Sequence, residues 1–203
     1  MTKPDYFAYG EAEIAYLKSK DPLLGAAIDT IGMIERAVTP DLFSALLNAI
    51  VGQQISTKAQ ATIWGRVKEK FTPLTPETIA AATEEELQGC GLSFRKVSYM
   101  KNIAADILAG RLDLPALTHM TDEEVCQRLC QIKGIGAWTA EMLMIFSMQR
   151  PNILSKDDLA IIRGLCRLYH HRKITPRLFA KYKRRYAPYA TVASLYLWAI
   201  ATD

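Results

Sequence analysis

The chain has 203 residues and a mass of 22.7 kDa, which suits one domain or two small lobes. Half of the residues are hydrophobic and 23% are charged, a balance that excludes an intrinsically disordered chain and a collagen-like repeat. The net charge is only +4, but the basic residues are concentrated near the C-terminus. Residues 159–202 contain no Asp or Glu and nine basic residues, Arg163, Arg167, Arg172, Lys173, Arg177, Lys181, Lys183, Arg184 and Arg185. This basic segment predicts a polyanionic partner, either nucleic acid or an anionic membrane surface.

A membrane-spanning segment is not expected. The longest nearly uncharged apolar run, residues 187–202, has about 16 residues, whereas a spanning helix needs roughly 20. The acidic residues Asp5, Glu11 and Glu13 follow Met1 closely, which is unlike a signal peptide. We therefore expect a soluble, intracellular protein, located in the cytoplasm or nucleoid if its source is bacterial.

Apolar residues recur with a period near 3.6 along the chain, and strand-like alternation flanked by hairpin turns is absent. We therefore expect an all-α fold of about ten helices joined by short loops. Two kinds of signal predict where helices begin. A capping residue before a Pro at the first helical position occurs, in chain order, at Asp21-Pro22, Thr39-Pro40, Thr75-Pro76 and Thr175-Pro176. Capping boxes are expected at Thr83–Glu86 and Thr121–Glu124.

Four cysteines stand at Cys90, Cys126, Cys130 and Cys166. They form no CxxC pair, and His119, His170 and His171 do not complete a spacing typical of zinc sites. A free Cys usually packs like a small hydrophobic residue, so we expect buried or half-buried free thiols.

Residues 129–140, Leu-Cys-Gln-Ile-Lys-Gly-Ile-Gly-Ala-Trp-Thr-Ala, lie between two helical patterns. Gly134 and Gly136 permit positive φ angles and the close approach of another backbone. The second helix is expected to begin at about Ala137, with its unpaired N–H groups and positive dipole end at the turn. Such a turn can bind phosphate without a side-chain charge. A Gly-x-Gly pair by itself also occurs in ordinary helix–helix turns.

The fuller string Ile132-x-Gly-Ile-Gly-x-Trp-Thr-Ala140 resembles the helix-hairpin-helix of the HhH-GPD DNA glycosylase superfamily, in which a catalytic Asp follows the hairpin. Three other segments resemble this family. Ala49–Ser56 is similar to its DNA-inserting loop, Ser155–Gly164 to the helix start that carries the Asp, and Tyr186–Trp198 to the last helix of the 3-methyladenine DNA glycosylase II (AlkA-like) branch. The resemblance covers about residues 40–200.

The resemblance implies a single two-lobed helical unit over residues 1–203, with DNA bound across the cleft between its lobes. It places the helix-hairpin-helix motif at about residues 122–148 and the DNA-inserting loop at about residues 50–56. No separate N-terminal β domain is expected, because residues 1–40 supply only one or two helices.

The implied activity is that of a monofunctional DNA glycosylase in base excision repair. Such an enzyme flips alkylated purines, 3-methyladenine and 7-methylguanine first, out of duplex DNA and hydrolyses their N-glycosidic bond. A glycosylase of the same fold for oxidised, deaminated or mismatched bases is one alternative, and a non-catalytic hairpin module that binds DNA is another. The expected partner is double-stranded DNA with damaged bases, bound by a monomer.

Asp158 is the residue that the resemblance marks as catalytic. Its carboxylate would stabilise an oxocarbenium-like sugar and orient or activate a water molecule. Asp157 is the competing assignment, and Ser155-x-x-Asp158 also fits a capping box. The Pro that the family usually places just before this Asp is missing.

Trp138 stands where family members with lyase activity carry a Lys that forms a Schiff base. We therefore expect water as the nucleophile and no lyase activity; Lys133 and Lys156 lie nearby in the sequence but not at the family's position. Trp138, Met142 and Trp198 are expected to line the base pocket, since a cationic purine over an indole face gains about 0.5–2 kcal/mol. A Trp at helical spacing can instead belong to the core.

The expected DNA contacts fall into two groups. Gln54 aligns with the residue that fills the gap left by a flipped base, with Gln53 and Ser56 beside it, although the Gln pair could simply form a polar loop. The remaining expected contacts are Gly134, Ile135, Gly136, Thr139 and Arg163, and the basic stretch 163–185 either contacts phosphates or forms a solvated surface.

We expect that the implied glycosylase activity requires no cofactor. The resemblance implies a structural Na⁺ or K⁺ held by the backbone carbonyls of Cys130, Ile132 and Ile135. An iron–sulfur cluster is not expected, because four closely spaced cysteines near the C-terminus are absent.

Overall fold

A computed structural model describes residues 5–202, which form helices and contain no β-strand, so the all-α prediction is confirmed. These residues form twelve α-helices and one 3₁₀-helix, whereas about ten helices were expected from the periodicity. No helix among them is both long and apolar enough to cross a membrane. In chain order the helices are α1 (Glu11–Lys20), α2 (Pro22–Ile31), α3 (Leu42–Gly52), α4 (Thr57–Lys70), α5 (Pro76–Ala81), α6 (Glu84–Gly89), α7 (Phe94–Leu108), η1 (Pro115–His119), α8 (Asp122–Cys130), α9 (Ala137–Phe146), α10 (Leu159–Leu168), α11 (Pro176–Tyr186) and α12 (Ala190–Thr202).

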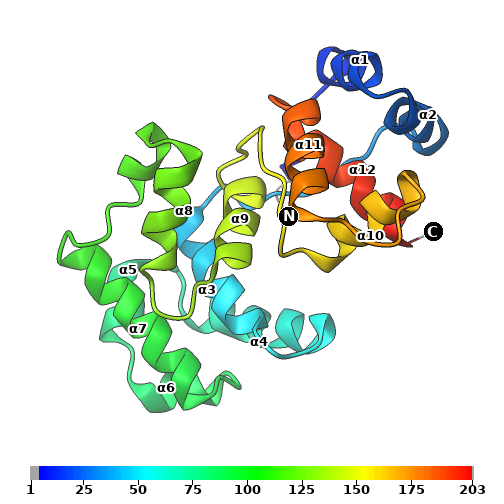
Figure 1. Cartoon of the computed structure of the whole chain (residues 1–203). Helices are drawn as coiled ribbons and strands as arrows, with labels where there is room; N and C mark the ends of the chain where they lie inside the picture. Colours follow the sequence, from blue (N-terminus) through cyan, green and yellow to red (C-terminus); the bar gives the residue numbers. More distant parts are fainter. Residues whose placement is uncertain (1–4, 203) are drawn as a thin grey trace. The chain divides into compact units, whose positions relative to one another are not determined.

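The chain divides into two compact units, whose helices can be followed by colour in Figure 1. The central unit runs from Thr39 to Leu143 and contains α3 to α8. The terminal unit combines the residues up to Val38 with those from Met144 onward, and contains α1, α2, α10, α11 and α12. The boundary lies within α9. Each unit is described by itself below.

Most of the predicted helix starts are confirmed. Asp21, Thr75 and Thr175 are N-caps followed by Pro, and the two predicted capping boxes are present at the starts of α6 and α8. The start predicted at Thr39-Pro40 was wrong, because α3 begins at Leu42 and is capped by Asp41. The Asp41 side chain accepts a hydrogen bond from the Ser44 N–H at 3.2 Å. Asp is a stronger N-cap than Thr, so the later residue determines the start.

The core of the central unit is organised around α7, which contacts α3, α5 and α6. Val97, Met100 and Ile103 of α7 are buried, and their spacing places them on one side of the helix. α3 contributes Leu47 and Ile50, which have no exposed surface. The end of α3 and the start of α7 therefore occupy fixed positions in this unit.

The core of the terminal unit is built around α12, most of whose residues are buried. α10 lies beside α12 (Figure 1) and packs against it at Gly164. A Cβ atom at Gly164 would lie 2.3 Å from the carbonyl oxygen of Leu197, closer than real Cβ contacts allow. The missing side chain thus lets the two backbones touch and fixes α10 against α12.

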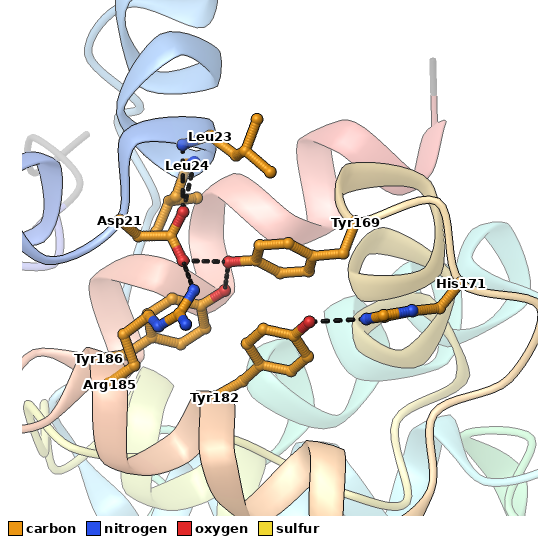
Figure 2. A network of polar contacts seen from close by, with 8 residues as sticks. All are labelled: Asp21, Leu23, Leu24, Tyr169, His171, Tyr182, Arg185 and Tyr186. Atoms are coloured by element: carbon orange, nitrogen blue, oxygen red, sulfur yellow. Dashed lines mark hydrogen bonds and ion pairs between the residues drawn. The ribbon is translucent and has the colours of Figure 1, made fainter.

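A buried carboxylate, Asp21, joins three helices of the terminal unit (Figure 2). One of its oxygens caps α2 by accepting the N–H groups of Leu23 and Leu24 at 3.1 and 3.0 Å. The other accepts the Tyr169 hydroxyl at 2.5 Å and the Arg185 guanidinium at 2.6 Å. Burial raises the pKa of Asp21, but the hydrogen bonds from Tyr169 and Arg185 outweigh it and hold this pKa below its ordinary value. The network connects α2, the end of α10 and α11.

The contact at Gly164 predicts the stability of two glycine variants. Gly164→Ala should lower the free energy of unfolding by about 1–3 kcal/mol, because the added methyl group overpacks the α10–α12 contact. Gly65→Ala is the matched control. Gly65 is an exposed position of α4 where a Cβ meets no atom within 4 Å, and this variant should be neutral or stabilising by up to about 1 kcal/mol. Urea unfolding followed by circular dichroism measures both; equal stability of the two variants would contradict the contact.

Candidate functional site

The glycine-containing segment predicted to be a hairpin joins α8 to α9 in the central unit. α9 begins at Ala137, as the sequence predicted. The turn is closed by a hydrogen bond from the Ile135 N–H to the Ile132 carbonyl at 2.9 Å, and the first bond of α9 runs from the Ala140 N–H to the Gly136 carbonyl. Gly136 is exposed. The positive end of the α9 dipole therefore lies at an exposed turn, an arrangement that suits an anionic group.

Gly134 anchors this turn on the central unit. Its φ angle is +96°, in the region that favours glycine. A Cβ atom at this position would lie 2.6 Å from the Tyr99 ring of α7 and 3.2 Å from Ile50 of α3. The Gln53 side-chain amide donates a hydrogen bond to the Gly134 carbonyl at 2.6 Å. Sequence reasoning placed Gln53 among the DNA contacts and missed this contact with the hairpin.

Gln54 is exposed in the short connection from α3 to α4, as are Ile55 and Ser56. α3 extends to Gly52, so the loop expected at about residues 50–56 consists of residues 53–56. Gln54 has a φ of +57°, and its side-chain oxygen accepts a hydrogen bond from Arg95 at 3.4 Å. Ser56 is the N-cap of α4, where its hydroxyl accepts the Ala59 N–H at 3.2 Å. The structure therefore gives Ser56 a role in shaping the loop that presents Gln54.

Lys96 supports the other end of this loop and was not singled out from the sequence. Its ammonium group donates a hydrogen bond to the Val51 carbonyl at 2.7 Å, in the last turn of α3. A cation at this place interacts favourably with the negative end of the helix dipole. Burial lowers the pKa of Lys96, and the neighbouring Arg95 lowers it further. The available sequence signal was a pair of cations just after a helix-capping Ser93.

Asp158 is the N-cap of α10 in the terminal unit. One carboxylate oxygen accepts the N–H groups of Ala160 and Ile161 at 2.9 and 3.0 Å, and the residue is only 7% exposed. The alternative explanation, a capping box from Ser155 to Asp158, does not describe the start of α10, because Asp158 is itself the N-cap and Ser155 lies buried before it. Asp158 itself reaches the first free N–H groups, as an Asp N-cap does. Asp157 is exposed.

Two hydroxyl groups of α12 hold the segment that leads to Asp158. The Thr191 hydroxyl donates to the Arg150 carbonyl at 2.6 Å and accepts the Ile153 N–H at 2.9 Å. The Ser194 hydroxyl donates to the Ile153 carbonyl at 3.0 Å. Both side chains are fully buried, and sequence reasoning missed them. The signal was a Thr and a Ser in the first half of a mostly apolar helix.

The three residues expected to line a base pocket have different surroundings. Trp138, the second residue of α9, is 47% exposed, and Met142 lies one turn later and is partly buried. Trp198 of α12 is partly buried at the margin of the terminal-unit core. It stacks on Phe146, with ring centroids 5.6 Å apart. Trp198 was expected to line the base pocket or, alternatively, to belong to the core. Its contact with the margin of the core agrees in part with the second possibility.

All four cysteines are free, as expected. Cys90 is buried and Cys126 and Cys166 are half-buried, but Cys130 is exposed, so the burial prediction was wrong for it. Cys130 is the last residue of α8, where the chain leaves the helix for the exposed turn. Within residues 5–202, no group of three or more His, Cys, Asp or Glu side chains could hold a metal ion.

Arg163, one of the residues expected to contact DNA, is exposed on α10.

The glycine-containing turn between α8 and α9, followed by a carboxylate at the start of α10, fits the helix-hairpin-helix class of DNA repair protein. A family model described as "HhH-GPD superfamily base excision DNA repair protein" matches residues 47–191. The chain belongs to this superfamily.

Similar proteins include DNA-3-methyladenine glycosylase 1 of Schizosaccharomyces pombe, which is 36% identical over 163 residues. That alignment covers 77% of this chain and 71% of the relative. A solved structure of a DNA-3-methyladenine glycosidase from Bacillus halodurans matches with a TM-score of 0.87 and 36% identity, over 97% of this chain and 92% of that one. The S. pombe 3-methyladenine DNA glycosylase in complex with abasic DNA matches with a TM-score of 0.80 and 31% identity, over 95% and 98% of the two chains.

The hairpin geometry predicts different effects at its two glycines. Gly134→Ala should lower the free energy of unfolding by more than about 1 kcal/mol, because it combines a positive φ with a clash against Tyr99. Gly136→Ala should leave stability unchanged, since its Cβ meets no atom within 4 Å, but should weaken binding to duplex DNA because the methyl group lies on the exposed turn. Thermal unfolding and fluorescence anisotropy measure the two effects. DNA binding by Gly136→Ala at wild-type affinity would contradict phosphate binding at this turn.

Proposed function

We propose that this protein is a monofunctional DNA glycosylase that flips alkylated purines, 3-methyladenine and 7-methylguanine first, out of duplex DNA and hydrolyses their N-glycosidic bond. The observation that carries the proposal is the Asp158 carboxylate, fixed at the start of α10 in a chain of the HhH-GPD superfamily. The names of the similar proteins, which are 3-methyladenine DNA glycosylases or glycosidases, support this substrate class.

Asp158 supplies the charge that this reaction needs. As the bond between the base nitrogen and C1′ of the sugar breaks, its electron pair leaves with the base and the sugar becomes oxocarbenium-like. A carboxylate near C1′ stabilises this positive charge and can orient the water that adds there, taking up its proton. An N-alkylated purine is cationic and leaves as a neutral base, so no strong general acid is required. The two N–H groups that bind Asp158 hold its carboxylate in place for this role.

Trp138 supports the monofunctional assignment. A lyase forms a Schiff base through a Lys just after the hairpin, and an indole ring cannot act as that nucleophile. Lys133 and Lys156 are exposed, and neither falls at the family's position. Water therefore remains as the nucleophile, and the product is an abasic site in an unbroken strand.

Aromatic side chains recognise the charged base in this proposal. The exposed part of Trp138 offers an indole face, and a cation over such a face gains about 0.5–2 kcal/mol. Met142 and Trp198 are the other two side chains that, in this proposal, contact the base. The ring of Trp198 stacks on Phe146, and the residue is partly buried rather than fully enclosed by the core.

Gln54 fills the gap that a flipped base leaves in the duplex. Extrusion of a base costs a few kcal/mol of stacking and pairing, and a side chain that enters the gap recovers part of it. Gln54 suits this role because it is exposed at the tip of a four-residue loop that is supported at both ends. Gln53, which binds the hairpin, and Ser56, which caps α4, set its position.

The hairpin binds the DNA backbone through Gly134, Ile135, Gly136 and Thr139, and Arg163 adds a phosphate contact from α10. The carbonyls of Cys130, Ile132 and Ile135 would hold a Na⁺ or K⁺ ion, which would supply positive charge at the hairpin when bound. The Ile132 carbonyl is compatible with such an ion, because it accepts one hydrogen bond and retains a second lone pair. The reaction itself requires no cofactor, and the enzyme acts as a monomer.

Base release from damaged duplexes tests the proposal. The protein is incubated with methylating-agent-treated DNA and, separately, with duplexes that contain 8-oxoguanine or uracil. We expect free 3-methyladenine and 7-methylguanine, unbroken abasic strands and no adduct after borohydride reduction. Strand breaks with a trapped adduct would overturn the monofunctional assignment, and release of only oxidised or deaminated bases would overturn the substrate class. No release from any duplex would favour a non-catalytic DNA-binding module.

A further inference from the structure

The helix α11 separates aromatic and basic residues on two faces. Arg177, Lys181 and Arg184 are spaced four and three residues apart, which places them in one stripe along the helix. All three are exposed. We call them the α11 stripe; at 1.5 Å of rise per residue it extends over about 10 Å. Tyr182 and Tyr186 lie on the other face and are buried.

The α11 stripe has no acidic side chain to neutralise it. The segment from residue 159 to residue 202 contains no Asp or Glu, and no ion pair between described residues involves any member of the stripe. By contrast, Arg185 of the same helix pairs with the buried Asp21. Like charges four residues apart repel each other on a helix, so an anionic partner would relieve this repulsion. A surface helix that serves only solubility usually mixes charges of both signs.

Packing of the opposite face fixes the direction in which the α11 stripe points. Tyr182 stacks on Tyr169 with ring centroids 4.2 Å apart, and the hydroxyl oxygens of Tyr169 and Tyr186 are 2.5 Å apart. In Figure 2, Arg185 and Tyr186 extend from α11 toward Asp21 and Tyr169, and the Tyr182 hydroxyl is joined to the His171 ring at 2.7 Å. These contacts prevent α11 from rotating. The stripe is therefore an exposed row of cations on a helix whose orientation in the terminal unit is fixed.

The same packing favours a nucleic acid over a membrane as the partner. A helix that binds a bilayer surface inserts an apolar face between the lipids. On α11 that face is already used within the terminal unit, where Tyr182 and Tyr186 are buried and Leu178 and Phe179 are partly buried against the core. What remains exposed on α11 is mostly charge, and its exposed apolar residues are only the small Pro176 and Ala180. This combination suits the phosphodiester backbone, which is bound by cations regardless of sequence.

We infer that the α11 stripe is a second DNA-contacting surface, additional to the hairpin, the Gln54 loop and the Asp158 site. Its partner is the phosphate backbone of duplex DNA, and its contribution is independent of base damage. Arg172 and Lys173, both exposed just before α11, extend the same positive surface. The inference rests on the proposed function, because a glycosylase must examine undamaged DNA before it reaches a lesion.

The salt dependence of binding to undamaged duplex DNA tests this inference. The variant carries Arg177→Gln, Lys181→Gln and Arg184→Gln, since Gln keeps the helix propensity. The control carries Lys20→Gln, Arg66→Gln and Lys68→Gln, three exposed cations on α1 and α4 with the same total change of charge. Each lost phosphate contact lowers the slope of log K against log[salt] by about 0.9. We expect the slope of the stripe variant to fall by about 2–3, its affinity at low salt to fall about tenfold or more, and the control to keep a slope close to that of the wild type.

Several outcomes would overturn the inference. An unchanged slope in the stripe variant would show that these cations do not contact phosphates, and an equal loss in both variants would show an effect of net charge. Binding of the wild type, but not of the stripe variant, to phosphatidylserine vesicles with unchanged DNA binding would assign the surface to membranes. Base release by the wild type is measured separately. If the protein released no base from any lesion, the proposed function would be contradicted, but the salt dependence of binding to undamaged DNA would still test the α11 stripe.

Discussion

The backbone contact between α10 and α12 at Gly164 determines where the Asp158 carboxylate lies in the terminal unit. Because Gly164 has no side chain, α10 rests directly on the Leu197 carbonyl of α12. The same α12 holds the segment before Asp158 through the hydroxyl groups of Thr191 and Ser194. One buried helix therefore positions both the helix that follows Asp158 and the chain that precedes it. An apolar helix with two hydroxyl groups is thus part of the support for the proposed chemistry.

Residues with structural roles stand beside each proposed functional residue. Asp158 is itself a helix cap, so the hydrogen bonds that begin α10 also fix the carboxylate proposed to act on the sugar. In the central unit, the hairpin and the Gln54 loop are joined by the bond from Gln53 to the Gly134 carbonyl. Lys96 completes this arrangement by capping the end of α3. A change at Gln53 or Lys96 would therefore alter how Gln54 is presented without removing Gln54 itself.

Local signals made much of the fold predictable from the sequence. Caps followed by Pro and the helix start at Ala137 depend on neighbouring residues, and most of these predictions are confirmed. Where two neighbouring residues could each be the N-cap of a helix, the sequence pattern predicted the wrong one. The N-cap of α3 is Asp41 and not the predicted Thr39.

Contacts between distant segments could not be predicted in this way. Asp21 and Arg185 are 164 residues apart, and Thr191 reaches back 41 residues to Arg150. Each of these polar groups looks ordinary in its own segment, and only the tertiary packing brings the pair together. The candidate site was predictable where the family resemblance supplied a motif, as at Asp158 and the hairpin. The supporting residues Lys96 and Ser194 belong to no motif, and the roles of the site residues in DNA binding and catalysis remain predictions.

The central claim is that Asp158 has two roles: its negative charge drives base release, and one of its oxygens caps α10. The variant Asp158→Asn, compared with Asp157→Asn, separates the catalytic role from the capping role. Asn is as good an N-cap as Asp, so the melting temperature of Asp158→Asn should stay close to that of the wild type. Its release of 3-methyladenine and 7-methylguanine from methylated duplex DNA should fall by roughly 100-fold or more, because the charge is lost. Asp157→Asn should retain activity. Release by Asp158→Asn at the wild-type rate, or loss of activity only in Asp157→Asn, would contradict the assignment.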